Sequence, residues 1–157
     1  MSVWFVSGSS RGFGLEIVRA ALEAGHSVVA TARDARTVRG KLPQAGEALL
    51  TVPLDVTDAA GIQTAVDAAI DRFGQVDVLV NNAGSGLPAA VEEADDDAVR
   101  NAATSLNHTQ PGDPAKAAQA IVDVASAPQP PLRLQLGTDI LQAFETKLDS
   151  FRKEMGA

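Results

Sequence analysis

The sequence predicts an α/β protein with a doubly wound parallel sheet that carries helices on both faces. Short apolar runs of strand length alternate with longer segments of helical periodicity along the chain. A glycine-rich turn joins the first of these runs to the first helical segment. With 157 residues, the chain is expected to form a single domain spanning residues 1–157.

Four short runs that are rich in β-branched residues are expected to form the strands of the sheet. They are Val3–Ser7, His26–Ala32, Leu49–Leu54 and Val76–Val80. A fifth run, Leu132–Leu136, has the sequence LRLQL and predicts one more strand near the end of the chain.

Helical segments separate the predicted strands. The longest of the first part is Ala59–Phe73, with Asp58 as the expected N-cap and Gly74 as the expected stop. Pro114–Ala127 predicts an alanine-rich helix that begins with proline in its first turn, and Asp139–Met155 predicts an amphipathic terminal helix. Right-handed connections between parallel strands then give a Rossmann-type sheet of order 3-2-1-4. We expect Leu132–Leu136 to dock beside the fourth strand and cover its open edge.

The turn SGSSRGFG, Ser7 to Gly14, lies between the first strand and the first helix. In such a turn the first glycine permits a tight bend, the second lets the backbone approach a pyrophosphate, and the last lets helix and strand pack closely. The helix N-terminus offers free N–H groups to the phosphates. The turn therefore predicts a dinucleotide site, and the alternative is a tight turn that binds nothing. The candidate binding residues here are Gly8, Ser10, Arg11, Gly12, Phe13 and Gly14.

The end of the second strand indicates which dinucleotide is bound. Proteins that bind NAD place a carboxylate at this point for the ribose 2′-hydroxyl. Here the strand ends in Thr31, Ala32 and Arg33, so alanine stands where the carboxylate would be. Arg33 and Arg11 could both contact a 2′-phosphate, which favours NADP(H) over NAD(H). Asp34 is expected to cap the short helix that follows.

Three motifs in this order resemble the short-chain dehydrogenase/reductase family, over about the first hundred residues. They are SGSSRGFG, then LDVTD (Leu54–Asp58), then NNAG (Asn81–Gly84). The resemblance implies an NAD(P)-dependent oxidoreductase in which Asp55 holds the adenine amino group and the backbone of Val56 lies beside it. It also implies that Asn82, Ala83 and Gly84 line the cofactor site. Residues 1–100 would then form the dinucleotide-binding part, and residues 101–157 a C-terminal helix–strand–helix.

The chain departs from the family pattern in its catalytic residues. The family uses a serine, a tyrosine and a lysine four residues after that tyrosine, and this chain contains no tyrosine. Lys116 and Lys147 lie in helical segments of different character, so neither takes the lysine role. The chain is expected to leave the family pattern near Asp95–Arg100. The segments Ser105–Ala125 and Pro130–Gly137 then resemble the last helix–strand unit of the family. We therefore expect a shortened form that lacks the central catalytic segment, and we assign no catalytic residue.

Three functions follow from this combination. The first is an NADP(H)-binding protein of the family without its usual catalysis. The second is a slow NADPH-dependent carbonyl oxidoreductase in which Ser85 or a water supplies the proton. The third is a non-catalytic interaction or regulatory module, for which a homodimer through the terminal helix and strand is plausible.

The composition excludes several other classes of function. The formal net charge of −7 argues against nucleic acid and anionic membrane as partners. The chain has no cysteine and 2 histidines, so neither a disulfide nor a cysteine or histidine metal cluster is expected. The acidic run Glu92–Asp97 is interpreted as a solvated helix start rather than a metal site. No apolar run approaches the length of about 20 residues that a membrane helix needs, and the default expectation is a cytoplasmic protein.

Overall fold

The strands form one parallel sheet in the order β3-β2-β1-β4, which confirms the predicted order. The computed structural model describes residues 1–84 and 112–156, apart from the side chains of residues 138–144. The strands are β1 (Val3–Val6), β2 (Ser27–Ala32), β3 (Leu49–Pro53) and β4 (Val78–Val80). Each lies within one of the apolar runs that predicted it.

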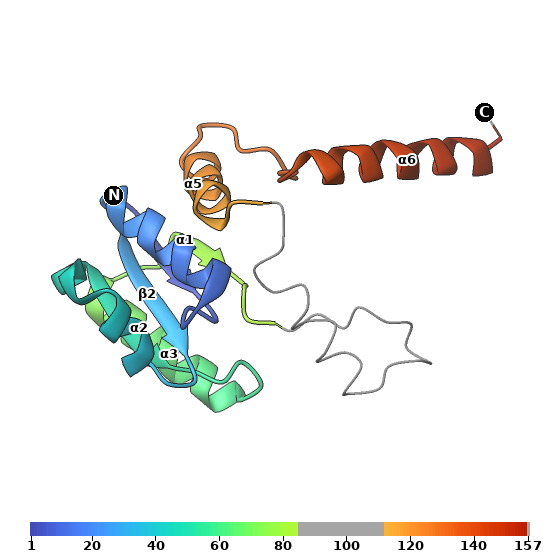
Figure 1. Ribbon diagram of the computed structural model, residues 1–157. Coiled ribbons are helices and arrows are strands. Elements are labelled where there is room, and N and C mark those ends of the chain that lie inside the picture. The colour runs from blue at the N-terminus through green and yellow to red at the C-terminus, as the bar shows by residue number, and fades with distance from the viewer. Residues whose placement is uncertain (85–111, 157) are drawn as a thin grey trace.

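Helices connect and follow these strands (Figure 1). They are α1 (Gly12–Glu23), α2 (Arg36–Lys41), the 3₁₀ segment η1 (Pro43–Ala48), α3 (Ala59–Phe73), α5 (Pro114–Ala125) and α6 (Thr138–Glu154). The bounds of α3 match the prediction because both of its ends carry a chemical signal. The Asp58 carboxylate accepts a hydrogen bond from the backbone of Ala60, and Gly74 ends the helix with a φ of 80°.

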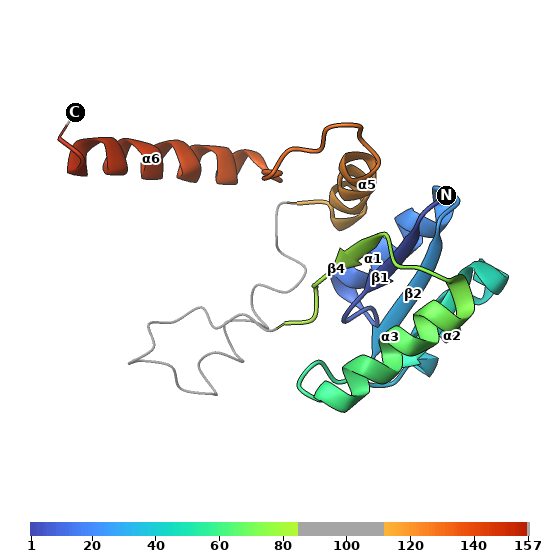
Figure 2. The same ribbon diagram turned by 180° about the vertical axis from the view of Figure 1, so that it is seen from behind.

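The two faces of the sheet bury separate apolar clusters, as a doubly wound sheet requires. In β1, Trp4 and Val6 belong to the cluster that includes α1 and α5, whereas Val3 and Phe5 belong to the cluster that includes α3. This alternation follows from the two-residue period of a strand. Figures 1 and 2 show α1 and α3 on opposite sides of the sheet. The sheet with α1, α2, α3 and α5 is called the α/β body below.

Helix α5 joins the α/β body although it comes late in the chain. Its first turn is capped by the Asp113 carboxylate, which accepts hydrogen bonds from the backbone of Ala115 and Lys116. Its Ala118 and Val122 are fully buried in the cluster that contains α1. The helix therefore covers apolar surface of α1 that would otherwise be exposed.

The predicted strand at Leu132–Leu136 is wrong. These residues form an irregular connection between α5 and α6, and the side chain of Leu132 is 91% exposed. Two prolines precede the run, and proline has no N–H to give to a sheet ladder. Within the described ranges, β1 is the one strand paired with β4, so the expected cover for the edge of β4 is not found there. Apolar and polar residues alternate in LRLQL as they do in a strand. A strand also needs a neighbouring strand with which to form hydrogen bonds.

Three interpretations from the sequence fall outside the described residues. These concern Ser85 as a proton donor, the acidic run Glu92–Asp97, and the point near residues 95–100 at which the family pattern was expected to end.

The packing of α5 on α1 predicts a specific loss of stability. Val122→Ala should lower the free energy of unfolding by about 1.5–2.5 kcal/mol, because two buried methyl groups are removed. Val124 is half-buried on the same helix, so Val124→Ala should cost clearly less. Urea unfolding of both variants, followed by circular dichroism, tests this. Equal losses would show that α5 does not belong to the buried core.

Candidate functional site

The glycine turn is anchored in the sheet by its serines. Ser9 is fully buried; its hydroxyl donates to the Val6 carbonyl at 2.8 Å and its backbone N–H donates to the Thr31 carbonyl at 2.8 Å. The turn is thereby fixed to the carboxyl ends of both β1 and β2. In open α/β sheets, ligands bind outside the carboxyl ends of the strands, where the strand order reverses. Here the order reverses between β1 and β4.

The three glycines of the turn meet two different requirements. A Cβ on Gly8 would lie 2.8 Å from the Ala83 Cα, and one on Gly14 would lie 2.6 Å from the Gly8 carbonyl oxygen. A Cβ on Gly12 would have no neighbouring atom within 4 Å, so the space on that side of the backbone is open. The φ of Gly12 is +58°. Gly8 and Gly14 are therefore needed for close packing, and Gly12 for backbone conformation.

Ser7 and Asn82 join the glycine turn to the loop after β4. The Ser7 hydroxyl accepts hydrogen bonds from the backbone N–H groups of Asn82 and Ala83, both at 3.0 Å, and donates to the Val80 carbonyl at 3.2 Å. In return, the Asn82 side-chain amide donates to the Ser7 carbonyl at 2.9 Å and to the Gly8 carbonyl at 3.2 Å. One hydroxyl and one amide therefore hold the two loops at a fixed separation.

The amino end of α1 faces this junction without a side-chain cap. Its N-cap residue is Arg11, whose side chain makes no capping hydrogen bond, and the first turn contains no acidic residue. The first N–H groups of a helix have no partner within the helix, and they carry a partial positive charge. This end of α1 can therefore donate hydrogen bonds to an anion.

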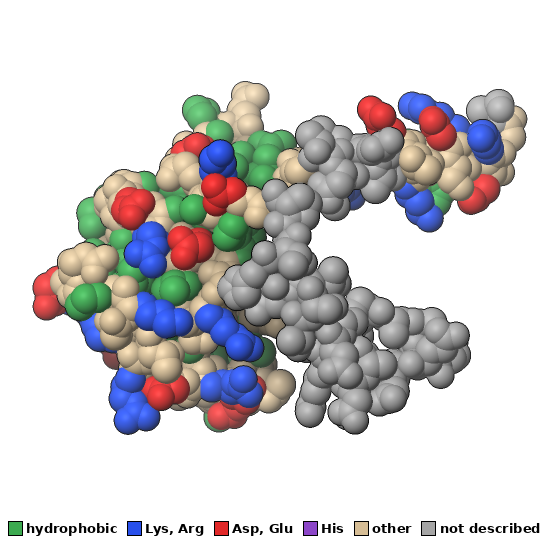
Figure 3. All heavy atoms as spheres, in the orientation of Figure 1, with side chains coloured by type: hydrophobic (Ala, Val, Ile, Leu, Met, Phe, Trp, Pro, Cys, Tyr) green, Lys and Arg blue, Asp and Glu red, His purple; other side chains and the backbone are tan. Residues whose placement is uncertain are grey.

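Cationic side chains surround the same end of the molecule. Arg11 and Arg33 are both exposed. Lys41, at the end of α2, donates from its Nζ to the Ser10 carbonyl in the glycine turn at 2.7 Å. Figure 3 shows Lys and Arg side chains on the face that carries α1 and α2. Sequence reasoning found the two arginines but missed Lys41, because it comes within reach of the turn only through the fold.

Asp34 is engaged by its neighbour Arg36. The Asp34 carboxylate accepts from the Arg36 guanidinium at 3.0 and 3.1 Å and from the Arg36 backbone at 3.1 Å. These bonds hold the pKa of Asp34 below its usual value, with the side-chain bond as the largest cause. The N-cap of α2 is Ala35, without a side-chain cap bond, so the expected N-cap at Asp34 is one residue too early. Asp34 still accepts from the backbone of the first residue of α2, and its charge has a direct partner.

Asp55 lies in the loop after β3, beyond the carboxyl end of that strand. Its Oδ1 accepts from the Thr57 backbone at 3.0 Å and from the Thr57 hydroxyl at 2.7 Å. The backbone bond is the largest cause that lowers the pKa of Asp55, and the charge of Arg33 lowers it further. Asp55 is therefore an ionised acceptor at neutral pH, fixed by one oxygen with the other, Oδ2, free of hydrogen bonds within the described residues.

The other predicted site residues divide into two groups. Ala83 is half-buried at the junction itself, whereas Gly84, Ser10 and Val56 lie on the loops around it, with Val56 44% exposed. Phe13 instead turns toward the interior and packs against the apolar cluster beneath α1. The fold thus places residues from the loops after β1, β2, β3 and β4 at one edge of the sheet.

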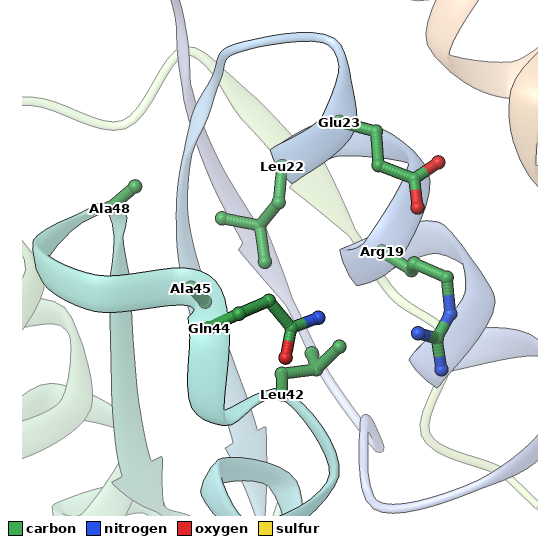
Figure 4. Close-up of a pocket in the computed structure, with 7 residues that line it drawn as sticks. All are labelled: Arg19, Leu22, Glu23, Leu42, Gln44, Ala45 and Ala48. Carbon is green, nitrogen blue, oxygen red and sulfur yellow. The ribbon is translucent and has the colours of Figure 1, made fainter.

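A separate shallow cavity of about 220 Å³ lies at the other end of α1 (Figure 4). It is lined by α1 and by the segment from Leu42 through η1, including Arg19, Leu22 and Gln44. Because the amino ends of parallel strands lie opposite the glycine turn, this cavity is not part of the candidate site.

The described residues lack the features of two other kinds of site. Among the described residues, no three His, Cys, Asp or Glu side chains lie close enough together to hold a metal ion. None of the helices in the described ranges is both long enough and apolar enough to span a membrane.

Comparison with known proteins gives a consistent family match. The family model described as short chain dehydrogenase matches residues 2–118. An oxidoreductase of Botryotinia fuckeliana is 46% identical over 96 residues, which cover 60% of this chain and 35% of that protein. An NADP-dependent 3-hydroxy acid dehydrogenase of Salmonella typhi is 39% identical over 82 residues, 52% of this chain and 33% of that protein. The chain thus spans about a third of the length of these curated relatives.

A solved structure extends the likeness to the whole chain. A short-chain dehydrogenase from Streptomyces avermitilis superposes with a TM-score of 0.84 at 24% identity, covering 98% of this chain and 94% of that one. At this identity the match establishes the fold.

The glycine geometry predicts three different outcomes for the same substitution. Gly14→Ala should lower the free energy of unfolding by at least about 2 kcal/mol, because its Cβ would collide with a backbone carbonyl. Gly12→Ala should cost only about 1 kcal/mol, since it adds strain at a positive φ in open space.

The control for these variants is Gly40→Ala in α2. Gly40 has open space and no positive φ, so alanine should leave stability unchanged or raise it by about 0.5–1 kcal/mol. Thermal unfolding of the three variants measures the order. If Gly14→Ala proved no more harmful than Gly12→Ala, the close approach of Gly14 to the Gly8 carbonyl would be refuted.

Proposed function

The chain belongs to the short-chain dehydrogenase family, a family of NAD(P)-dependent oxidoreductases, and we propose that it binds NADP(H) across the carboxyl ends of β1, β2 and β4. The observation that carries the proposal is the glycine turn held by Asn82 against the loop after β4, next to an uncapped helix N-terminus. The cofactor-binding residues of the proposal are Gly8, Ser10, Arg11, Gly12, Phe13, Gly14, Arg33, Asp55, Val56, Asn82, Ala83 and Gly84, to which we add Lys41.

The amino end of α1 suits the pyrophosphate. Its free N–H groups donate to phosphate oxygens, and the helix dipole favours their negative charge. The open space before Gly12 leaves room for phosphate against the backbone, where a Cβ would stand in the way. Gly8 and Gly14 support this geometry from behind, by letting the turn lie against Ala83 and Asn82.

The cations near the end of β2 suit a 2′-phosphate. Arg33 and Arg11 are exposed and can each present a planar guanidinium, which pairs well with phosphate oxygens. Lys41 is held at the glycine turn by the Ser10 carbonyl and adds a positive charge there. In a chain of net charge −7, this local concentration of positive charge is what allows an anionic ligand to bind.

The ion pair between Asp34 and Arg36 also favours the phosphorylated cofactor. A free carboxylate near this position would accept the ribose 2′-hydroxyl of NAD and repel a 2′-phosphate. Asp34 is instead occupied by the Arg36 guanidinium at two positions, which offsets its charge. We infer that Arg36 acts as a neutralising partner that removes the obstacle to NADP(H).

The adenine contact rests on Asp55. Its Oδ1 is held by Thr57, so the carboxylate has a fixed direction, and Oδ2 can accept a hydrogen bond from the exocyclic amino group. The low pKa of Asp55 keeps it an acceptor at neutral pH. Val56 follows in the same exposed loop and supplies the neighbouring backbone.

The bound cofactor would supply a hydride from its nicotinamide. These 157 residues bind and orient that cofactor, but they contain no tyrosine to give or take the proton at a substrate carbonyl. We therefore propose NADP(H) binding as the function of this chain and expect carbonyl reduction by the chain alone to be slow.

Calorimetric titration with NADPH and NADH tests the binding proposal. The unaltered chain should bind NADPH more tightly than NADH. Arg33→Ala should weaken NADPH binding by roughly tenfold or more, the loss expected for a charge-assisted hydrogen bond, and change NADH binding little. Lys41→Ala should act in the same direction with a smaller effect, because Lys41 also contacts the Ser10 carbonyl.

Two further variants make the titration specific. Arg19→Ala removes the same charge at the other end of α1 and should leave both affinities unchanged. Arg36→Ala frees the Asp34 carboxylate and should weaken NADPH binding while improving NADH binding. Equal affinity of the unaltered chain for both nucleotides would refute the preference for NADP(H), and no binding of either would refute the site.

The missing tyrosine predicts the outcome of an activity assay. The assay uses saturating NADPH and a panel of aldehydes and ketones, and follows the oxidation of NADPH by its absorbance at 340 nm. The rate should be about 10²–10⁴-fold lower than that of an enzyme with a positioned general acid. The proton then comes from water, so the rate should rise as the pH falls. Rapid turnover of any substrate would show that another group of this chain supplies the proton.

A further inference from the structure

Helix α6 runs away from the α/β body and leaves an apolar surface uncovered. Figures 1 and 2 show it projecting from the rest of the molecule in both views. Its described apolar side chains are partly or largely exposed: Leu148 is 37% exposed, Phe151 46% and Met155 78%. We call these three residues the α6 stripe. A helix of 17 residues is marginal alone in water, so such a surface needs a partner.

The spacing of the α6 stripe is that of a coiled coil. Its members are three and then four residues apart, and in the sequence Phe144 and Leu141 continue the same alternation toward the start of the helix. Alternating steps of three and four residues place side chains at positions a and d of a heptad, which form the seam between two helices. Leu141, Leu148 and Met155 occupy a, and Phe144 and Phe151 occupy d.

Four charged residues flank this seam. In the same heptad, Glu145 and Arg152 occupy the e positions, and Lys147 and Glu154 occupy the g positions. The structure shows this placement directly for Lys147, whose Nζ lies over the Phe151 ring at 4.8 Å from its centroid. Lys147 is therefore placed beside the seam. The Arg152 guanidinium contacts Asp149 of its own helix at 3.0 Å, so in the dimer it would exchange this exposed pair for one with the second copy.

We propose that α6 binds α6 of a second copy of this chain as an antiparallel coiled coil. In the register that places Leu148 opposite Phe151 of the second copy, Met155 lies opposite Phe144 of that copy. The two-fold symmetry of such a dimer repeats each contact. The interface is isologous and closes on itself, so it gives a dimer and not a filament.

The flanking charges select the antiparallel orientation. In an antiparallel pair, e faces e and g faces g, so Glu145 lies beside Arg152 of the second copy. In the same way, Lys147 lies beside Glu154 of the second copy. Every cross-pair is then of opposite charge, and symmetry doubles each one.

The parallel orientation is disfavoured by the same residues. In a parallel pair, g of one helix faces the e position five residues further on in the other. Lys147 would then face Arg152 of the second copy, which places like charges together and repeats the repulsion by symmetry.

The contact spans about two heptads, so the dimer is expected to be concentration-dependent. Sedimentation equilibrium of the full chain over the micromolar to submillimolar range should show a monomer–dimer equilibrium. Leu148→Asp should weaken dimerisation by more than about tenfold, because it places a charge in the seam of both helices. The melting temperature of the α/β body should not change, since α6 lies outside it.

Charge reversal tests the orientation. Glu145→Arg and Arg152→Glu should each weaken the dimer by about three- to tenfold, and the double variant should restore it, because each reversed charge again faces its opposite. Lys153→Glu is the matched control: it makes the same charge change one residue away, at heptad position f on the outer face, and should leave the dimer constant unaltered.

Three outcomes would overturn the proposal. A monomer at every concentration would exclude the dimer. A dimer that Leu148→Asp leaves intact, and that Val66→Asp on the exposed side of α3 disrupts, would place the interface on the α/β body instead. A double charge variant as weak as the single ones would exclude the antiparallel register.

Discussion

The link between Ser7 and Asn82 is the interaction on which the candidate site depends. It joins two loops that are far apart in sequence but that follow adjacent strands, β1 and β4. Its atoms are partly buried, so losing one partner would leave donors and acceptors unsatisfied at a cost of about 1–3 kcal/mol each. Because these bonds set the separation of the loops, Gly8 and Gly14 can lie against Ala83 and Asn82, and the amino end of α1 keeps a fixed direction.

The sequence predicted those parts of the molecule whose signals are local. Helix α3 carries its N-cap and its terminating glycine in its own sequence, and its predicted bounds agree with the structure. The run Leu132–Leu136 failed because its alternation is local, whereas strand formation requires a neighbour that alternation does not reveal. The same limit applies to Lys41 and to the Ser7 hydroxyl, whose contacts join residues 31 and 75 or more positions apart.

Charge in this chain acts locally and not through its total. A net charge of −7 would repel a dinucleotide from most of the surface. Arg33, Lys41 and the amino end of α1 lie together at one edge of the sheet, and Arg36 pairs with Asp34, the carboxylate that follows Arg33 in the chain. Exposed pairs of this kind add little to stability. These charged groups matter more for specificity, because they determine the sign of the charge next to a bound ligand.

Binding of a cofactor and pairing of two copies would use different parts of the chain. The proposed cofactor site depends on loops after the strands, whereas the proposed dimer depends on α6, which contributes nothing to the sheet. A variant that disrupts the α6 stripe should therefore leave nucleotide affinity intact, and a variant at Arg33 should leave the dimer constant intact. Coupling between the two would require a state in which α6 contacts the α/β body, because two sites influence each other only through contacts that differ between states.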